Sequence, residues 1–140
     1  MCNFGTKNKD QGARTDYLPT KLNNMHNFRN MRIWHESIDL LEKIHSITKS
    51  YPSDERYGLI SQMRRSASSI PSNIAEGSSR DSQKEFKHFL SISLGSAFEL
   101  FTHLEISNRM GYIDEKIKNE LMQSTNEIER KISSFRKQLK

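Results

Sequence analysis

Residues 57–80 read YGLISQMRRSASSIPSNIAEGSSR, and this stretch decides the fold. Its apolar residues recur at steps of three and four, which keeps them on one face of an α-helix: Leu59, Met63, Ala67, Ile70 and Ile74. Burial of each large side chain contributes about 1.5–3 kcal/mol, which outweighs the weak helix propensity of the serines. We therefore predict a helix over about 54–76, kinked or split at Pro71 and stopped by Gly77.

The opposite face of this predicted helix carries small polar residues instead of the Lys and Glu of an ordinary solvated face. No charged residue occurs between Arg65 and Glu76. A face of this kind is typical of a second packing surface, so we predict that it contacts another subunit. Its members are Gly58, Ser61, Gln62, Arg65, Ser69, Ser72, Asn73 and Glu76.

Three further stretches with apolar residues at helical spacing predict three further helices. The first covers about 28–50 and stops before Pro52, with an apolar stripe made of Met31, Trp34, Ile38, Leu41, Ile44 or His45, Thr48 and Tyr51. Another covers about 82–110, opening with a capping box at Ser82 and closing at Gly111; the last starts at Asp114 and runs to about 139. We see no strand pattern, so we predict an all-α antiparallel up-down-up-down four-helix bundle over 28–140.

The predicted helix at 82–110 is also two-sided. No formal charge occurs from His88, taken as neutral, to Phe98. Because both central helices share this character, we predict a homo-oligomer, although the pattern does not determine the number of subunits. The residues predicted for the oligomer interface or a buried polar network are Arg65, Ser69, Asn73, Glu76, Ile92, Gly95, Ser96 and Glu99.

The net charge of +5 is unevenly divided over the 140 residues. Residues 1–30 carry +3, and residues 1–27 show no apolar period, so we predict a flexible basic N-terminal tail there. The alternative is a basic arm that reaches nucleic acid or a partner. The remaining +2 is a weak argument for nucleic acid, so any such argument must come from local clusters of charge.

Cysteine usage and hydropathy restrict the cellular setting. The single cysteine, Cys2, excludes an intramolecular disulfide framework and a zinc–cysteine cluster. The first thirty residues contain no signal-peptide core, and no apolar run approaches the length of a membrane span. We predict a cytoplasmic protein with no membrane partner and no cofactor.

Short strings spread over residues 28–113 form a recognisable pattern. They are Trp34, Tyr51-Pro52, Tyr57-Gly58-Leu59, Gln62-Met63-Arg64-Arg65, the string SIPSNIAEG at 69–77, Arg80, Glu85, Phe89-Leu90, Gly95-Ser96 and Glu99-Leu100. This pattern resembles the bacterial four-helix-bundle proteins of the 23S rRNA intervening-sequence protein family. That family is similar to the accessory variability proteins of diversity-generating retroelements. Ser66 and Phe101 depart from it, since alanine and an acidic residue are usual there.

The resemblance implies a four-helix bundle that assembles as a barrel-like homopentamer, with no established enzymatic activity. The retroelement members are similar to basic partners of a reverse transcriptase that bind nucleic acid. The resemblance therefore implies RNA or DNA, a reverse transcriptase and further copies of the chain as partners.

Arg64, Arg65 and Arg80 are the candidates for nucleic-acid binding, because guanidinium groups bind phosphate bidentately and a ring would repeat them. The alternative for Arg65 is an ion pair with Glu99 or Glu76 across the subunit interface. We predict a non-enzymatic, nucleic-acid-binding accessory protein. The alternative is a protein-interaction scaffold without nucleic-acid contact.

Catalytic and metal-binding patterns are weak in this chain. No two histidines are four residues apart and no HExxH string occurs, so we predict no metal site. Arg29 and His35 have the spacing of the Arg-x(4–6)-His signature of HEPN ribonucleases, which provides a remote third hypothesis. No G-x-S-x-G elbow and no glycine-rich phosphate loop is present.

Overall fold

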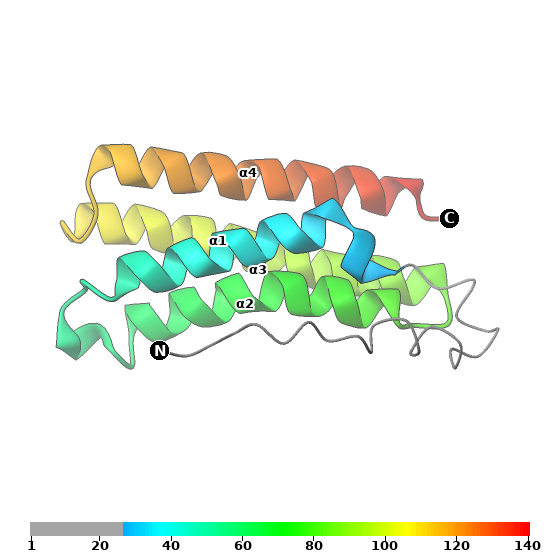
Figure 1. Cartoon of the computed structure of the whole chain (residues 1–140), viewed down its shortest axis with the longest axis horizontal. Helices are drawn as coiled ribbons and strands as arrows, with labels where there is room; N and C mark the ends of the chain where they lie inside the picture. Colours follow the sequence, from blue (N-terminus) through cyan, green and yellow to red (C-terminus); the bar gives the residue numbers. More distant parts are fainter. Residues whose placement is uncertain (1–26) are drawn as a thin grey trace, which may run out of the picture.

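The computed structural model describes residues 27–140, which form four long α-helices and no β-strand. The helices are α1 (Arg32–Thr48), α2 (Leu59–Ser78), α3 (Gln83–Arg109) and α4 (Glu115–Gln138), and the 3₁₀ helices η3 (Phe28–Asn30) and η4 (Ser53–Glu55) precede α1 and α2. The four helices lie alongside one another and consecutive helices run in opposite directions (Figure 1). The predicted all-α four-helix fold is confirmed. The tail predicted over residues 1–27 lies outside the described residues, apart from Asn27.

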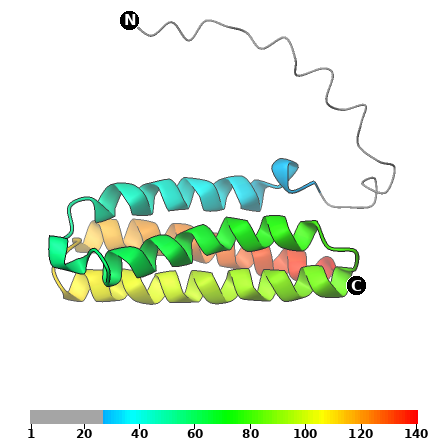
Figure 2. The same cartoon turned by 90° about the horizontal axis from the view of Figure 1, so that it is seen from below.

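The core contains residues of all four helices. The α2–α3 pair packs most extensively, and these two helices lie side by side in Figure 2. The apolar stripe predicted for α2 is buried throughout. The stripe predicted before Pro52 is buried at Ile44, Thr48 and Tyr51. It was wrong by one residue at two places, because Ile33 and Leu40 are buried while Trp34 and Leu41 are only partly buried. Each pair consists of adjacent apolar residues, and contact with both α2 and α4 decides which of the two points inward.

Two predicted helix starts were too early. Residues 28–30 form η3 instead of joining α1, because Met31 has an extended backbone with ψ of 123°. The second helix begins at Leu59 instead of residue 54, because Gly58 has a ψ of −112° that separates η4 from α2. The carboxylate of Glu55 accepts a 3.1 Å hydrogen bond from the Leu59 N–H, which satisfies one free donor at the start of α2.

The end of the second helix differs from the prediction in two ways. Of the two alternatives given for Pro71, a kink or a split, the split is wrong, because Pro71 is buried within a continuous α2. Gly77 does not stop the helix but lies inside it, one residue before its end. A Cβ atom at this position would lie 2.7 Å from the Phe86 ring and 2.8 Å from Cβ of Phe89. Gly77 is therefore needed for the close approach of α3.

Three predicted helix-end signals are confirmed. The Ser82 hydroxyl accepts a 3.1 Å hydrogen bond from the Glu85 N–H at the start of α3. Gly111 has a φ of +79°, the left-handed conformation that ends α3. The Asp114 carboxylate accepts a 2.8 Å hydrogen bond from the Ile117 N–H at the start of α4.

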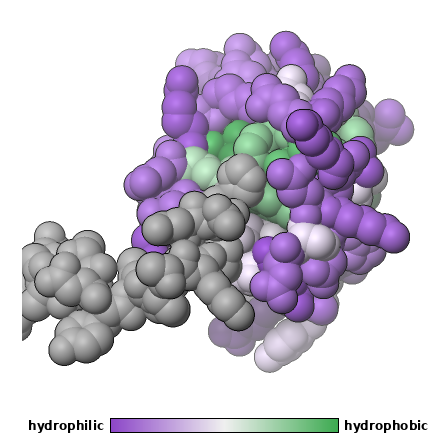
Figure 3. All heavy atoms as spheres, turned by 90° about the vertical axis from the view of Figure 1, so that its right-hand side faces the viewer, coloured by the Kyte–Doolittle hydropathy of each residue, from purple (hydrophilic) through white to green (hydrophobic). Residues whose placement is uncertain are grey.

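The end of the bundle at which α1 begins and α4 ends shows apolar side chains within a rim of hydrophilic ones (Figure 3). The Phe86 and Phe135 rings pack edge to face near this end, with centroids 5.4 Å apart. Within residues 27–140, no helix combines the length and apolarity that a membrane span requires.

Candidate functional site

The predicted interface residues lie on the side of the bundle formed by α2 and α3. The hydroxyl of Ser96 donates a 2.8 Å hydrogen bond to the hydroxyl of Ser69, and the amide of Asn73 donates to the same hydroxyl at 2.9 Å. These three residues thus form a polar network between the two helices of one chain. A shallow groove of about 370 Å³ follows the same seam, lined by Gln62, Arg65, Ser66, Ser69, Ser96 and Glu99.

The outer face of α3 continues this surface with exposed apolar side chains. Ile92 and Ile106 are 40% and 41% exposed, and Met110 is 56% exposed. Between them, a Cβ atom at Gly95 would meet no other atom within 4 Å. An apolar row on an open helix face is typical of a surface that packs against another protein.

Arg65 has no acidic partner within the described part of the chain. It is exposed and lines the α2–α3 groove together with Glu99, but the two side chains form no ion pair. Glu76 instead accepts a 2.7 Å hydrogen bond from Arg80. Neither of the two acids considered for Arg65 therefore pairs with it within one chain.

The three candidate arginines point to different parts of the surface. The Nε of Arg64 donates a 3.0 Å hydrogen bond to the hydroxyl of Thr48 on α1. Arg65 faces the other side of α2. The end of α2 lies about 21 Å from Arg64 along the helix, at 1.5 Å per residue, and Arg80 follows that end. The guanidinium of Arg80 lies 4.7 Å above the Phe89 ring. One chain therefore does not bring the three together.

A second group of cations surrounds a hollow of about 410 Å³ at the connection between α1 and α2. Sequence reasoning singled out Arg64 but missed Lys49 and Arg56. The two lie on either side of Pro52, and no helical face contains both. The only sequence signal was the presence of basic residues on both sides of a helix break. The hollow is lined by Thr48, Lys49, Tyr51, Ser53, Arg56, Ile60 and Arg64.

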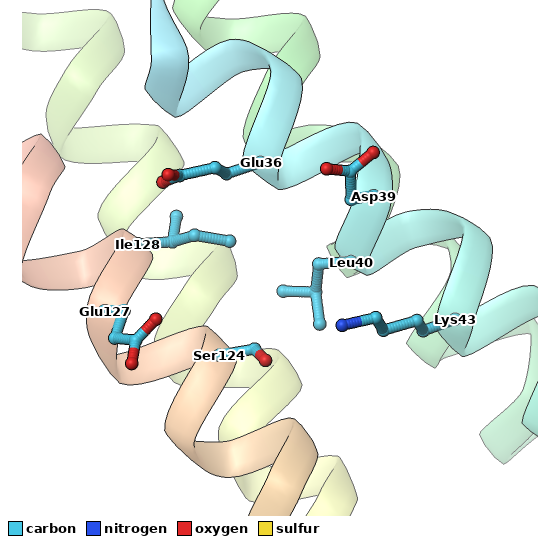
Figure 4. Close-up of a pocket in the computed structure, with 7 residues that line it drawn as sticks. All are labelled: Glu36, Asp39, Leu40, Lys43, Ser124, Glu127 and Ile128. Carbon is cyan, nitrogen blue, oxygen red and sulfur yellow. The ribbon is translucent and has the colours of Figure 1, made fainter.

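A smaller groove of about 170 Å³ lies between α1 and α4, where Glu36, Leu40 and Lys43 of α1 point toward α4 (Figure 4). The Glu36 carboxylate binds the Lys131 ammonium at 2.7 Å. In the part of the chain that the structure describes, no three His, Cys, Asp or Glu side chains are grouped so that they could hold a metal ion. Glu36 also pairs with Arg32, at 3.3 Å.

Within residues 27–140, neither His35 nor His103 has a side-chain hydrogen bond that would form an acid–base pair. The ring Nε2 of His35 lies 2.7 Å from the backbone carbonyl of Arg29, so it donates to the main chain. The Arg29 guanidinium instead lies 5.0 Å from the Phe28 ring. His103 is buried with no hydrogen bond to either ring nitrogen, and its Nε2 lies 3.6 Å from a Glu99 oxygen.

Comparison with known proteins confirms the resemblance drawn from the sequence. The family described as 23S rRNA-intervening sequence protein matches residues 29–134. The crystal structure of a protein of unknown function from the S23 ribosomal protein family of Bacteroides thetaiotaomicron is 25% identical to this chain, with a TM-score of 0.70. The match covers 75% of this chain and 98% of that chain. No curated protein matches. The protein described here belongs to the 23S rRNA-intervening sequence protein family.

Proposed function

We propose that this protein is a non-enzymatic cytoplasmic accessory protein that assembles with copies of itself and binds nucleic acid. The observation that carries the assembly is the exposed α3 face, which carries Ile92, Ile106 and Met110 and is open at Gly95. Covering these side chains with a second copy removes apolar surface from water. A pentameric ring is the arrangement that the family resemblance implies, with the α2 and α3 faces forming the contact.

Arg65 and Glu99 support this assembly by their lack of an ion pair within one chain. Both line the α2–α3 groove on the side that a neighbouring copy would cover. A covered arginine requires an opposite charge. In the ring, Arg65 would pair with Glu99 of the next copy or face a phosphate at the rim.

Nucleic-acid binding is supported by the basic side chains that α2 presents. Within residues 27–140, neither Arg64 nor Arg65 forms an ion pair with an acid, so both retain uncompensated positive charge. A ring repeats each arginine in every copy, and closely spaced cations attract the phosphate backbone. Arg80 is the third proposed contact, although Glu76 competes for its guanidinium.

A protein-interaction scaffold, with a reverse transcriptase as one such partner, is the second candidate function. The Arg80–Glu76 ion pair favours it, because this pair removes one of the three proposed phosphate contacts. A scaffold of this kind would form the same ring but would not bind nucleic acid.

Two experiments test the proposal. Sedimentation at micromolar concentration should give a particle several times the 16.4 kDa chain mass, and Gly95→Arg should dissociate it. Gln123→Arg, which adds the same charge on the exposed side of α4, should leave it intact. In a filter-binding titration, Arg64→Ala with Arg80→Ala should weaken RNA or DNA binding and flatten its salt dependence. A monomeric wild type contradicts the assembly, and a ring that binds no nucleic acid supports the scaffold.

A further inference from the structure

We propose that the hollow between α1 and α2 is a phosphate-binding site that holds one phosphodiester group of a nucleic-acid strand. This inference rests on the proposed nucleic-acid function and adds residues that the family pattern does not contain. Three cationic residues from separate segments line the hollow: Lys49 follows α1, Arg56 follows η4, and Arg64 belongs to α2. Its volume of about 410 Å³ is typical of a small-ligand site.

Contacts within the single chain already orient the Arg64 side chain. Its Nε donates to the Thr48 hydroxyl at 3.0 Å, and that hydroxyl donates to the Ile44 carbonyl at 2.7 Å. Thr48 is 1% exposed, so this support is rigid. The terminal nitrogens of Arg64 bind no other residue of the described chain. A guanidinium held at Nε with both terminal nitrogens available is arranged for bidentate contact with phosphate oxygens.

The two acids of η4, Asp54 and Glu55, form no ion pair with a cation of the hollow within the described residues. The two carboxylate oxygens of Glu55 accept hydrogen bonds from the Tyr112 hydroxyl, at 3.2 Å, and from the Leu59 N–H. Burial is the main cause of a raised pKa of Tyr112, and the negative charges of Glu55 and Asp54 add to it. The Glu55 carboxylate is thus engaged by Tyr112 and by the start of α2, and within residues 27–140 it forms no ion pair with the cations of the hollow.

The remaining lining groups also suit an anion. Burial is the main cause of a raised pKa of Tyr51, so this side chain adds no negative charge at neutral pH. The hydroxyl of Ser53 supplies a neutral donor at the rim. Neither Lys49 nor Arg56 pairs with an acid in residues 27–140. By contrast, Arg80 is already bound to Glu76, so the hollow is the stronger phosphate site.

The test compares two double variants of the full chain. Lys49→Gln with Arg56→Gln removes two charges from the hollow, and Lys116→Gln with Arg130→Gln removes two exposed charges from α4. All four residues lie outside the buried core, and thermal melting checks that both variants fold. The probes are a single-stranded RNA oligonucleotide, followed by fluorescence anisotropy, and inorganic phosphate, followed by the amide NMR shifts of Ser53 and Arg56.

The hollow variant should bind the oligonucleotide about tenfold more weakly, because charged hydrogen bonds are lost, and the α4 variant should change by less than about twofold. Equal losses in both variants would overturn the site while leaving nucleic-acid binding in place. A second outcome is that the wild-type protein does not bind the oligonucleotide, while inorganic phosphate shifts these amide signals in the wild type but not in the hollow variant. This outcome would overturn the proposal of nucleic-acid binding and identify free phosphate as the ligand. No response to either probe would overturn both proposals.

Discussion

The Ser96 hydroxyl on α3 donates a 2.8 Å hydrogen bond to the Ser69 hydroxyl on α2, across the most extensively packed pair of helices. Because serine is small, the two helices approach closely while their polar groups remain satisfied. The serines of this seam are therefore bonded within one chain. On this side the apolar side chains of α3 remain partly exposed, and Arg65 and Glu99 form no ion pair with each other.

Ser96→Ala should lower the free energy of unfolding by about 0.5–1.5 kcal/mol, because Ser69 loses a partly buried hydrogen bond. Urea denaturation measures the loss. Ser46→Ala, at an exposed position on α1, serves as the control and should change the stability by less than about 0.5 kcal/mol. Strict additivity of Ser69→Ala and Ser96→Ala in a double-mutant cycle would contradict a direct interaction.

Gly77→Ala should destabilise the protein by about 1–3 kcal/mol, because the new methyl group would overlap Phe86 and Phe89 at less than 3 Å. Ser134→Ala, at an exposed position on α4, serves as the control and should change the stability by less than about 0.5 kcal/mol. Differential scanning calorimetry compares the two. A Gly77→Ala protein as stable as wild type would show that α3 does not approach α2 as closely as described.

Glu129→Gln should stabilise the protein at neutral pH. Burial raises the pKa of Glu129 above its usual 4.5, while Arg130 lowers it, and one carboxylate oxygen is buried without a hydrogen bond. A raised folded-state pKa means that the folded protein binds the proton more tightly, so stability falls as the pH rises through this range. The gain from glutamine should therefore be absent at pH 3.5 and present at pH 7, as a rise in Tm on the order of 1–2 °C. An equal gain at both pH values would exclude ionisation as the cause.

Asp114→Ala should lower the stability by about 0.5–2 kcal/mol, because α4 loses the carboxylate that accepts from the Ile117 N–H. Asp114→Asn keeps an acceptor oxygen and should retain most of the stability. Thermal melts of both variants measure the difference. If Asn and Ala were equally harmful, the charge of Asp114 would matter more than its hydrogen bond.

Local sequence patterns predicted much of the fold, but they predicted only some of the residues of the candidate site. The α2 stripe was predicted correctly because an apolar period of three to four residues is itself a property of the helix. Lys49 and Arg56 were missed because the turn around Pro52, not a helical period, brings them to the same hollow as Arg64.

The sequence by itself determined the helical class and the ends of helices at Ser82, Gly111 and Asp114, because caps and periodicity act within a few residues. Only the tertiary structure decided that Ile33 and Leu40 face the core, that Pro71 is accommodated in an unbroken helix and that Gly77 admits two phenylalanines. These outcomes depend on contacts between helices. At these contacts, residues that are distant in sequence pack against one another. The free energy of this packing is larger than the free energy of the local helix preferences, so packing decides the outcome.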